Sequence, residues 1–214
     1  MAKQGVSLRK MCKVIGCAFE NALRLHFDSI LLFDNDSYPS AYFLSILALE
    51  ELGKVTMLDN FVWHSRIDGR RNAKDEQESI DGIFQHQIKQ RVFANDAEWF
   101  VPKKLLEDFR DGKIEVMKQN AVYVGLTRKN RKSDLNGKVI SPYDVGLLKA
   151  RRQITVVNDF LLDLTLGTLK EVYCIDTEEV ESMLNEELLA ELTERWAFKG
   201  HVANNRVKQL ASVR

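Results

Sequence analysis

Three charged residues interrupt the apolar face of a long hydrophobic segment between residues 39 and 64. Apolar residues recur there every three or four positions, and Glu50, Glu51 and Lys54 occupy positions of this repeat where an apolar residue is expected. This spacing places side chains on one side of a helix, so we expect the three charges to be at least partly buried. A buried carboxylate must be paired or hydrogen-bonded, because desolvating a lone charge costs several kcal/mol. The three residues therefore form either a buried polar network that fixes helix packing or a dimer interface, or the lining of a functional site.

A histidine and a lysine with helical spacing follow further along the chain. His86 and Lys89 are three residues apart, so on a helix both side chains can reach one ligand. An imidazole titrates near neutral pH and an ammonium binds phosphate. One interpretation is a site in which His86 is the acid–base group and Lys89 a phosphate contact, beside Glu51. The alternative is that both are solvated residues on the outer face of a helix.

The periodicity of the apolar residues predicts a chain built mainly of helices. Ser7 is placed to cap the first helix, and Pro39 fits the first turn of the second. Asp176 and Glu179 suggest a capping box for the last one. The predicted helices span residues 7–32, 39–64, 75–94, 102–118 with a break near 111–112, 142–173 and 176–196. In the predicted third helix, the apolar side contains Ile80, Ile83, Phe84 and Ile88.

The stretch 121–140 is the one place where strands are expected. Residues 121–126 are the best strand candidate, and a basic turn separates them from a short apolar run at 138–140. The fold class that follows is a mainly α helical bundle with a small β-hairpin excursion near residues 121–140.

Composition limits the classes of protein to which this chain can belong. Its 214 residues are 45% hydrophobic and 29% charged, with 3 Pro and 11 Gly, which is typical of one globular helical domain over 1–214. Three scattered cysteines favour a cytoplasmic protein without disulfides or a zinc site, and no apolar run is long enough to cross a membrane. Four scattered histidines and the lack of a Gly-rich phosphate loop predict no metal and no cofactor.

The net charge is zero, yet the charges are unevenly distributed along the chain. Residues 128–152 contain eight basic and two acidic residues, whereas residues 171–194 contain nine acidic residues and no Lys or Arg. A basic segment can bind phosphates, although a charge run is more often a solvated surface. The predicted RNA-binding residues are Arg128, Lys129, Arg131, Lys132, Arg151 and Arg152.

Several short motifs, in order from residue 14 to residue 142, resemble the AbiV family of bacterial abortive-infection proteins. The most specific is Ser37-Tyr38-Pro39-Ser40-Ala41-Tyr42 followed by Leu47-Ala48-Leu49-Glu50-Glu51-Leu52-Gly53-Lys54. Weaker matches are Ala18-Phe19-Glu20-Asn21-Ala22, His86-x-x-Lys89, and Lys118-Gln119-Asn120-Ala121-Val122-Tyr123-Val124 with Pro142 after a loop. The resemblance implies a family-like core over about 7–172, followed by an acidic C-terminal helix and tail over 176–214.

The resemblance also implies a fold and a role. AbiV-like proteins are grouped with the HEPN superfamily of helical bundles and are associated with translation shutdown in phage-infected cells. This implies a homodimer, an RNA or ribosome-associated target, and an infecting phage as a candidate source of an activator protein. Many HEPN proteins are metal-independent ribonucleases that use an Arg and a His separated by four to six residues.

One Arg–His pair here matches that pattern. Arg195 stands six positions before His201, and His86 has no such Arg before it. In a ribonuclease the His would act on the ribose 2′-hydroxyl and the Arg would stabilise the phosphorane. With four histidines in the chain, chance alone gives about one such match. Because Gly200 argues against one rigid helix, a surface turn is the alternative.

Two main hypotheses follow. The first is an antiphage effector that shuts down translation by cleaving or binding RNA. The second is a non-enzymatic homodimeric interaction module that binds a phage or translation partner, with Glu50, Glu51 and Lys54 as structural contacts. A weaker third is a small-ligand-binding or nucleotide-binding bundle. Replacing His86 and His201 separates the first two, because a ribonuclease needs an acid–base group.

Overall fold

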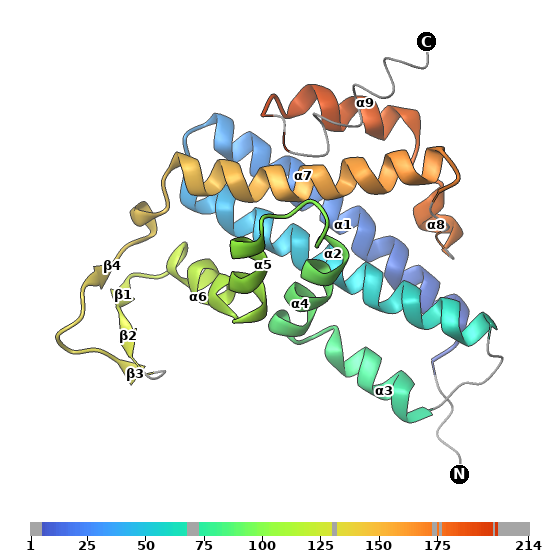
Figure 1. The fold of residues 1–214 in the computed structure, drawn as a ribbon, viewed down its shortest axis with the longest axis horizontal. Helices are drawn as coiled ribbons and strands as arrows, with labels where there is room; N and C mark the ends of the chain where they lie inside the picture. The colour runs from blue at the N-terminus through green and yellow to red at the C-terminus, as the bar shows by residue number, and fades with distance from the viewer. Residues whose placement is uncertain are drawn as a thin grey trace.

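Two long antiparallel helices form the base on which the other elements pack (Figure 1). They are α1 (Leu8–Asp34) and α2 (Tyr38–Ile67). The Ser7 hydroxyl accepts a hydrogen bond from the Lys10 backbone N–H at 3.3 Å, so the predicted cap is confirmed. The computed structural model describes residues 6–67, 73–129, 132–172, 175, 177–198 and 200.

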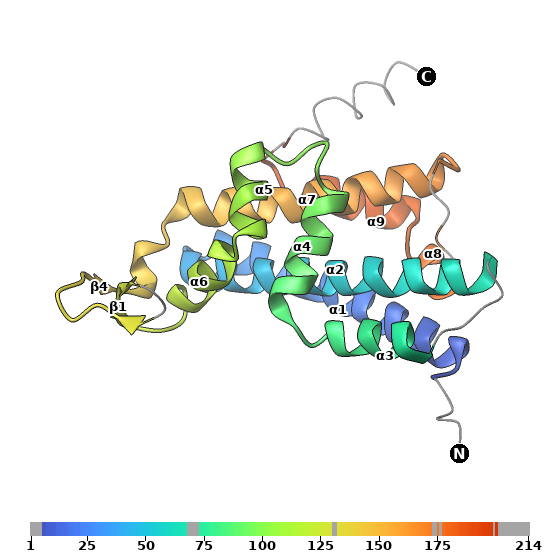
Figure 2. The same ribbon diagram turned by 60° about the horizontal axis from the view of Figure 1, so that its bottom comes forward.

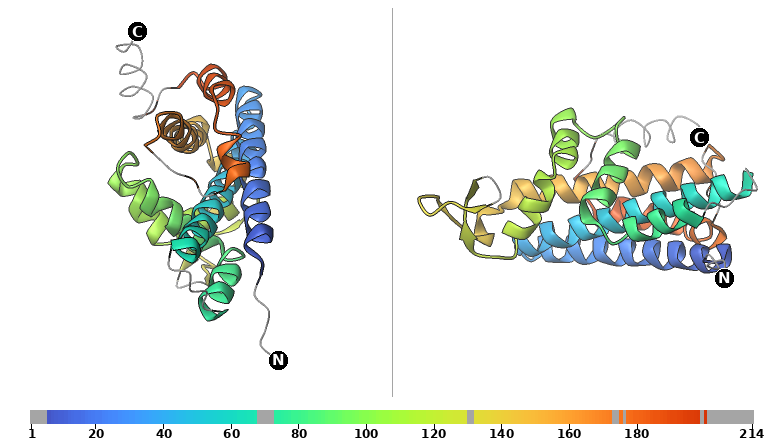
Figure 3. Two further views of the ribbon diagram at one scale, coloured as in Figure 1. Left: turned by 90° about the vertical axis from the view of Figure 1, so that its right-hand side faces the viewer. Right: turned by 90° about the horizontal axis from the view of Figure 1, so that it is seen from below.

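A third long helix, α7 (Leu147–Leu169), lies along the first two and completes the core. Figure 3 shows the three helices running side by side in the view from below. Apolar side chains from all three meet with essentially no exposed surface. The large, fully buried ones include Phe19, Ile46, Leu49, Ile154 and Leu161. The expected helical bundle is confirmed.

Four shorter helices continue from the end of α2 (Figure 2). They are α3 (Ala73–Gly82), α4 (His86–Asp96), α5 (Lys103–Arg110) and α6 (Lys113–Asn120). The break predicted near residues 111–112 is confirmed, since Gly112 adopts a φ of 71° between α5 and α6. The single helix predicted over 75–94 is wrong: the chain turns between α3 and α4, and Phe84, expected on the apolar side, is 74% exposed.

The hairpin excursion is present and projects from one end of the bundle (Figure 1). Strand β1 (Gly125–Leu126) pairs antiparallel with β4 (Val139–Ile140), and β2 (Arg128–Lys129) with β3 (Lys132–Ser133). Residues 121–124, expected to be strand, lie outside the ladder. A 3₁₀ turn, η1 (Pro142–Asp144), then leads into α7.

The acidic C-terminal segment forms two helices, where the sequence predicted one. They are α8 (Glu178–Glu181) and α9 (Glu186–Arg195), and the Asn185 side chain caps α9 by accepting from the Leu188 N–H at 2.9 Å. Asp176, the predicted cap, lies outside the described residues. Trp196 anchors the segment, because its ring is 5.2 Å from that of Phe33. Among the described helices, none is long and apolar enough to cross a bilayer.

Candidate functional site

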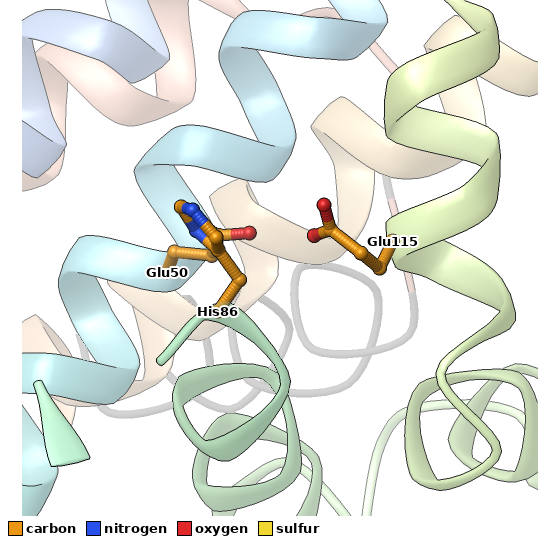
Figure 4. A group of neighbouring side chains, drawn as sticks. All are labelled: Glu50, His86 and Glu115. Carbon is orange, nitrogen blue, oxygen red and sulfur yellow. The ribbon is translucent and has the colours of Figure 1, made fainter. Parts of the chain in front are cut away.

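A buried carboxylate on α2 collects donors from two other helices. Glu50 is 1% exposed, and side chains from α4 and α6 surround it. Figure 4 shows Glu115 pointing from α6 toward Glu50 and His86. We call the set the Glu50 cluster. It comprises Glu50, His86, Lys89, Gln90, Glu115 and Lys118.

Each oxygen of Glu50 has two polar neighbours. Oε1 accepts hydrogen bonds from Gln90 Nε2 and Lys118 Nζ, both at 2.8 Å. Oε2 lies 2.6 Å from His86 Nδ1 and 3.7 Å from Lys89 Nζ. Lys118 also pairs with Glu115 at 2.7 Å. The desolvation cost of Glu50 is therefore offset by hydrogen bonds and positive charge, as a buried carboxylate requires.

A glycine on α2 lets α4 approach closely enough to form the cluster. A Cβ atom at Gly53 would collide with the backbone carbonyl of Lys89. Gly53 lies almost one turn after Glu50, and Lys89 almost one turn after His86, so the close contact of the two backbones brings the start of α4 over Glu50. The contact thus positions the α2 and α4 side chains of the cluster, and α6 contributes Glu115 and Lys118.

The surroundings of Glu50 keep it ionised. Burial alone would raise its pKa, but hydrogen bonds from Lys118, His86 and Gln90 outweigh that effect and lower the pKa below its usual range. Burial is also the largest influence on Lys89: it lowers the pKa of this ammonium, while Glu50 opposes the shift. An ionised Glu50 beside two lysines follows from this balance.

The ionised carboxylate determines which nitrogen of His86 can act as a base. Because ionised Glu50 can only accept hydrogen bonds, Nδ1 of His86 must carry the proton that faces it. The lone pair of a neutral His86 is then on Nε2. The His86 side chain is 52% exposed, whereas that of Glu50 is 2% exposed. The pair resembles the carboxylate-oriented imidazoles that serve in general acid–base catalysis.

The sequence matches the HEPN_AbiV family model, described as AbiV, over residues 10–155. This match covers more than half of the chain. The chain belongs to the AbiV family. Membership indicates an abortive-infection role of the HEPN type. No curated protein and no solved structure gave a significant match to the chain.

Residues from three of the AbiV-like motifs noted in the sequence meet at one place. Glu50 and Gly53 come from the Glu-Glu-Leu-Gly-Lys string, His86 and Lys89 from the His-x-x-Lys element, and Lys118 from the later stretch. In the structure all five contribute to the Glu50 cluster, although Lys118 is 68 residues from Glu50. Gln90 and Glu115 complete the cluster and were missed, because neither belongs to a quoted motif.

The predicted network of Glu50, Glu51 and Lys54 divides into two parts. Lys54 bonds both oxygens of Glu51, at 2.8 and 2.6 Å, whereas Glu50 bonds to side chains of α4 and α6. On a helix, neighbouring residues point about 100° apart, and Glu51 therefore turns away from the side where Glu50 lies. Its pair with Lys54 lines an open groove of about 510 Å³ beside α1. His86 contacts Glu50 through Nδ1, at 2.6 Å, whereas the sequence predicted it beside Glu51.

The other predicted site residues lie elsewhere. Arg195 on α9 pairs with Glu191 at 2.8 Å and lies over the Phe27 ring. His201 is outside the described residues, so a catalytic role for the Arg195–His201 pair stays a prediction. Arg131 is also outside them. The other predicted RNA-binding residues lie on three elements. Arg128 and Lys129 form β2, Lys132 is in β3, and Arg151 and Arg152 are on α7.

One group of side chains has the geometry of a metal site. Ligand atoms of Glu50, His86 and Glu115 lie within 4.8 Å of one another. However, the ammonium of Lys118 lies 2.8 Å from Glu50 and 2.7 Å from Glu115, and Lys89 adds a second positive charge. A divalent cation would have to displace or repel them. The donor set therefore fits the hydrogen-bonded cluster better than a metal ion.

Proposed function

We propose that this AbiV-family chain is an antiphage effector that shuts down translation by cleaving RNA, with His86 as the acid–base group. The observation that supports the proposal most directly is the exposed imidazole held by the buried, ionised Glu50. This arrangement makes Nε2 the nitrogen of the neutral ring that can accept a proton.

The reaction that suits such a group is transesterification within RNA. His86 Nε2 takes the proton of a ribose 2′-hydroxyl, and the 2′ oxygen attacks the adjacent phosphorus. The bond from phosphorus to the 5′ oxygen breaks, and the protonated imidazole returns the proton to that leaving oxygen. The products are a 2′,3′-cyclic phosphate and a 5′-hydroxyl, and no metal ion enters the balance.

Lys89 and Lys118 support this chemistry indirectly. Both are 5% exposed and face Glu50, so we assign them to stabilising its ionised form. A direct phosphate contact by Lys89 would require its ammonium to leave Glu50. Gln90 bonds both Glu50 and Glu115, at 2.8 and 3.2 Å, and links the two carboxylates.

The test is translation in a cell-free extract with purified protein, followed by gel analysis of rRNA, tRNA and mRNA. It is run in extracts from uninfected and from phage-infected cells, because an infecting phage is a candidate source of an activator. We expect arrest with RNA fragments for the wild-type chain and neither for His86→Ala. His64→Ala is the matched control, since His64 is an exposed histidine on α2 outside the cluster. His201→Ala tests the Arg195 match in the same assay.

A second candidate function is favoured by a groove beside the hairpin. About 1010 Å³ of open space is lined largely by apolar and aromatic residues, among them Tyr38, Phe43, Val122 and Tyr143. Tyr143 is 90% exposed and Val124, which also lines the groove, 72%. Exposed apolar patches of this kind mark protein interfaces.

This candidate is a non-enzymatic, homodimeric module that binds a phage protein or a component of the translation apparatus. If the chain is such a module, translation should stop while the RNA stays intact. Tyr143→Ser should abolish this arrest, and His86→Ala should leave it unchanged. Light scattering should then report a dimer. Arrest in neither extract would reject both candidates as translation inhibitors.

A further inference from the structure

The groove beside the hairpin and the Glu50 cluster are built on the same two helices. On α2, Phe43 lines the groove and Glu50 lies seven positions later, which is two helical turns. Both side chains therefore lie on one side of α2, about 10 Å apart along its axis. On α6, Lys118 belongs to the cluster, and Ala121, which follows the helix, lines the groove. Figures 1 and 2 both show α6 between the hairpin and α4. A long ligand in the groove can thus reach the cluster.

Two tyrosine rings are exposed at this groove. Tyr143 lines it and is almost fully exposed, and Tyr123, 68% exposed, lies between the lining residues Val122 and Val124. The turn η1 holds the backbone of Tyr143, because its N–H donates to the Ser141 hydroxyl at 3.4 Å. An exposed ring on a fixed backbone offers a flat apolar face on which a nucleobase can stack.

Positive charge lies close to these rings. Lys149 donates to the backbone carbonyl of Asp144 at 3.0 Å, which holds its ammonium near Tyr143. Lys138 is exposed directly before β4, and strands β2 and β3 carry three of the predicted RNA-binding residues. Aromatic rings beside basic residues are the combination that binds single-stranded nucleic acid.

Two aspartates are also close to this surface. Asp36 lines the groove and accepts a hydrogen bond from the Tyr38 hydroxyl. Asp144 accepts from the Ser141 backbone N–H at 2.9 Å. Both carboxylates thus have local hydrogen-bond donors, and residues 128–152 still contain eight basic residues against two acidic ones. The hairpin end of the chain therefore attracts phosphate.

We propose that the groove binds single-stranded RNA, with bases stacked on the tyrosine rings and phosphates paired with Lys138 and Lys149. This inference rests on the proposed function, because it names the form of RNA that reaches His86. Unpaired bases are required, since stacking on a side chain needs a base that can be splayed out of its own strand. A protein partner matches the apolar lining, whereas the lysines beside the rings match a phosphate backbone.

The test is fluorescence anisotropy of a labelled RNA of about twelve nucleotides, titrated with the full chain. The His86→Ala variant is used so that the RNA stays uncut while binding is measured. We expect saturable binding of the single strand, and binding weaker by roughly tenfold or more for the same RNA annealed to its complement. Equal affinity for strand and duplex would reduce the effect to general charge attraction. No binding of either would leave the groove to a protein partner, and both results would overturn the proposal.

Substitutions in the same background separate stacking from charge. Tyr143→Ala should weaken binding by roughly tenfold or more at unchanged salt dependence, because a stacked base is lost and no phosphate contact is. Tyr143→Phe retains the ring and should bind as tightly as the parent. Lys149→Gln should lower the slope of log affinity against log salt by about 0.7. Trp63→Ala is the matched control, since Trp63 is an exposed aromatic residue on α2 that does not line the groove. Equal affinity in Tyr143→Ala and Trp63→Ala would contradict the assignment.

This proposal and the proposed function fail in different ways. Binding that depends on Tyr143, together with RNA cleavage that survives in His86→Ala, would keep the RNA site and reject His86 as the acid–base group. RNA fragments from the wild-type chain, together with binding that ignores Tyr143→Ala, would keep the ribonuclease and reject this site. Circular dichroism confirms that each variant is folded.

Discussion

The backbone of Gly53 lies directly against the carbonyl group of Lys89, so that α2 and α4 touch without a side chain between them. This contact places His86 over Glu50, and it is the narrowest packing constraint on the candidate site. Replacing Gly53 therefore tests whether the geometry of the cluster depends on the helix approach.

Gly53→Ala should push α4 away from α2 and lengthen the His86–Glu50 contact. We expect a loss of about 1–3 kcal/mol in the free energy of unfolding, as for other overpacked cores, together with loss of the His86-dependent activity. Urea unfolding monitored by circular dichroism measures the stability. Gly125→Ala is the control, since a Cβ atom there meets nothing within 4 Å; equal losses in both variants would contradict the packing argument.

Glu50→Gln should destabilise the fold far more than Glu51→Gln. The first removes the carboxylate that faces the buried Lys89 and leaves Lys118 with Glu115 alone, at a cost of about 3–5 kcal/mol. The second breaks a partly exposed pair with Lys54, worth about 1 kcal/mol or less. Chemical unfolding of both variants at pH 7 compares them. Similar losses would mean that the two glutamates carry equivalent roles.

The same cluster predicts a loss of stability in acid. Because the pKa of Glu50 is lower in the folded chain than in the unfolded chain, its contribution is present above the usual glutamate range and disappears as the pH falls through the folded value. Unfolding free energies should therefore fall below a pH of about 4.5 in the wild type, and Glu50→Gln should fall less steeply there. A parallel pH profile in the two proteins would count against an ionised Glu50.

His26 predicts a second, separate pH dependence. It is fully buried and bonded to Asn158 at 2.9 Å, and burial lowers its pKa from 6.5 to about 4. As the pH falls from 6.5 to 4, the unfolded chain takes up a proton that the folded chain does not. Stability should fall over this window by up to about 3 kcal/mol. Thermal unfolding of His26→Gln should lack the decline, whereas the exposed His64→Gln should keep it.

Trp196 tests whether the segment beyond the family match unfolds with the rest of the chain. Its ring packs against Phe33, and its Nε1 donates to Thr155 at 3.1 Å. Trp196→Ala should cost about 3–5 kcal/mol and shift the whole unfolding transition. Trp63→Ala, at a 44% exposed position, should cost about 1 kcal/mol or less. A shift confined to a separate minor transition would assign α9 to an independent unit.

Local signals in the sequence predicted the long helices well and the site only in part. Ser7 and the apolar repeat located α1, and Pro39 marked the start of α2, because caps and periodicity act within a few residues. Gly82, the last residue of α3, is the one local signal for the break before α4, and a lone glycine inside an apolar repeat is a weak one. The apolar repeat across 80–88 was therefore extended through a turn.

The sequence also singled out Glu50 and Glu51 without separating their roles. Periodicity places both near the apolar face, and only the packing of α4 and α6 decides which one is buried. Gln90 and Lys118 reach Glu50 across 40 and 68 residues, and no local pattern encodes such a pairing. Family motifs were the one available signal for Lys118, and for Glu115 there was none.

Glu50 also has a consequence for the order in which the chain assembles. The α1–α2 pair is joined by a short turn and can form early, but a charged group on α2 resists losing its water until Lys118 and the residues of α4 arrive. Collapse of the chain around α2 before these helices pack would bury Glu50 without its partners, which costs free energy. The cluster thus favours cooperative folding, in which α1 and α2 reach their final packing together with α4 and α6.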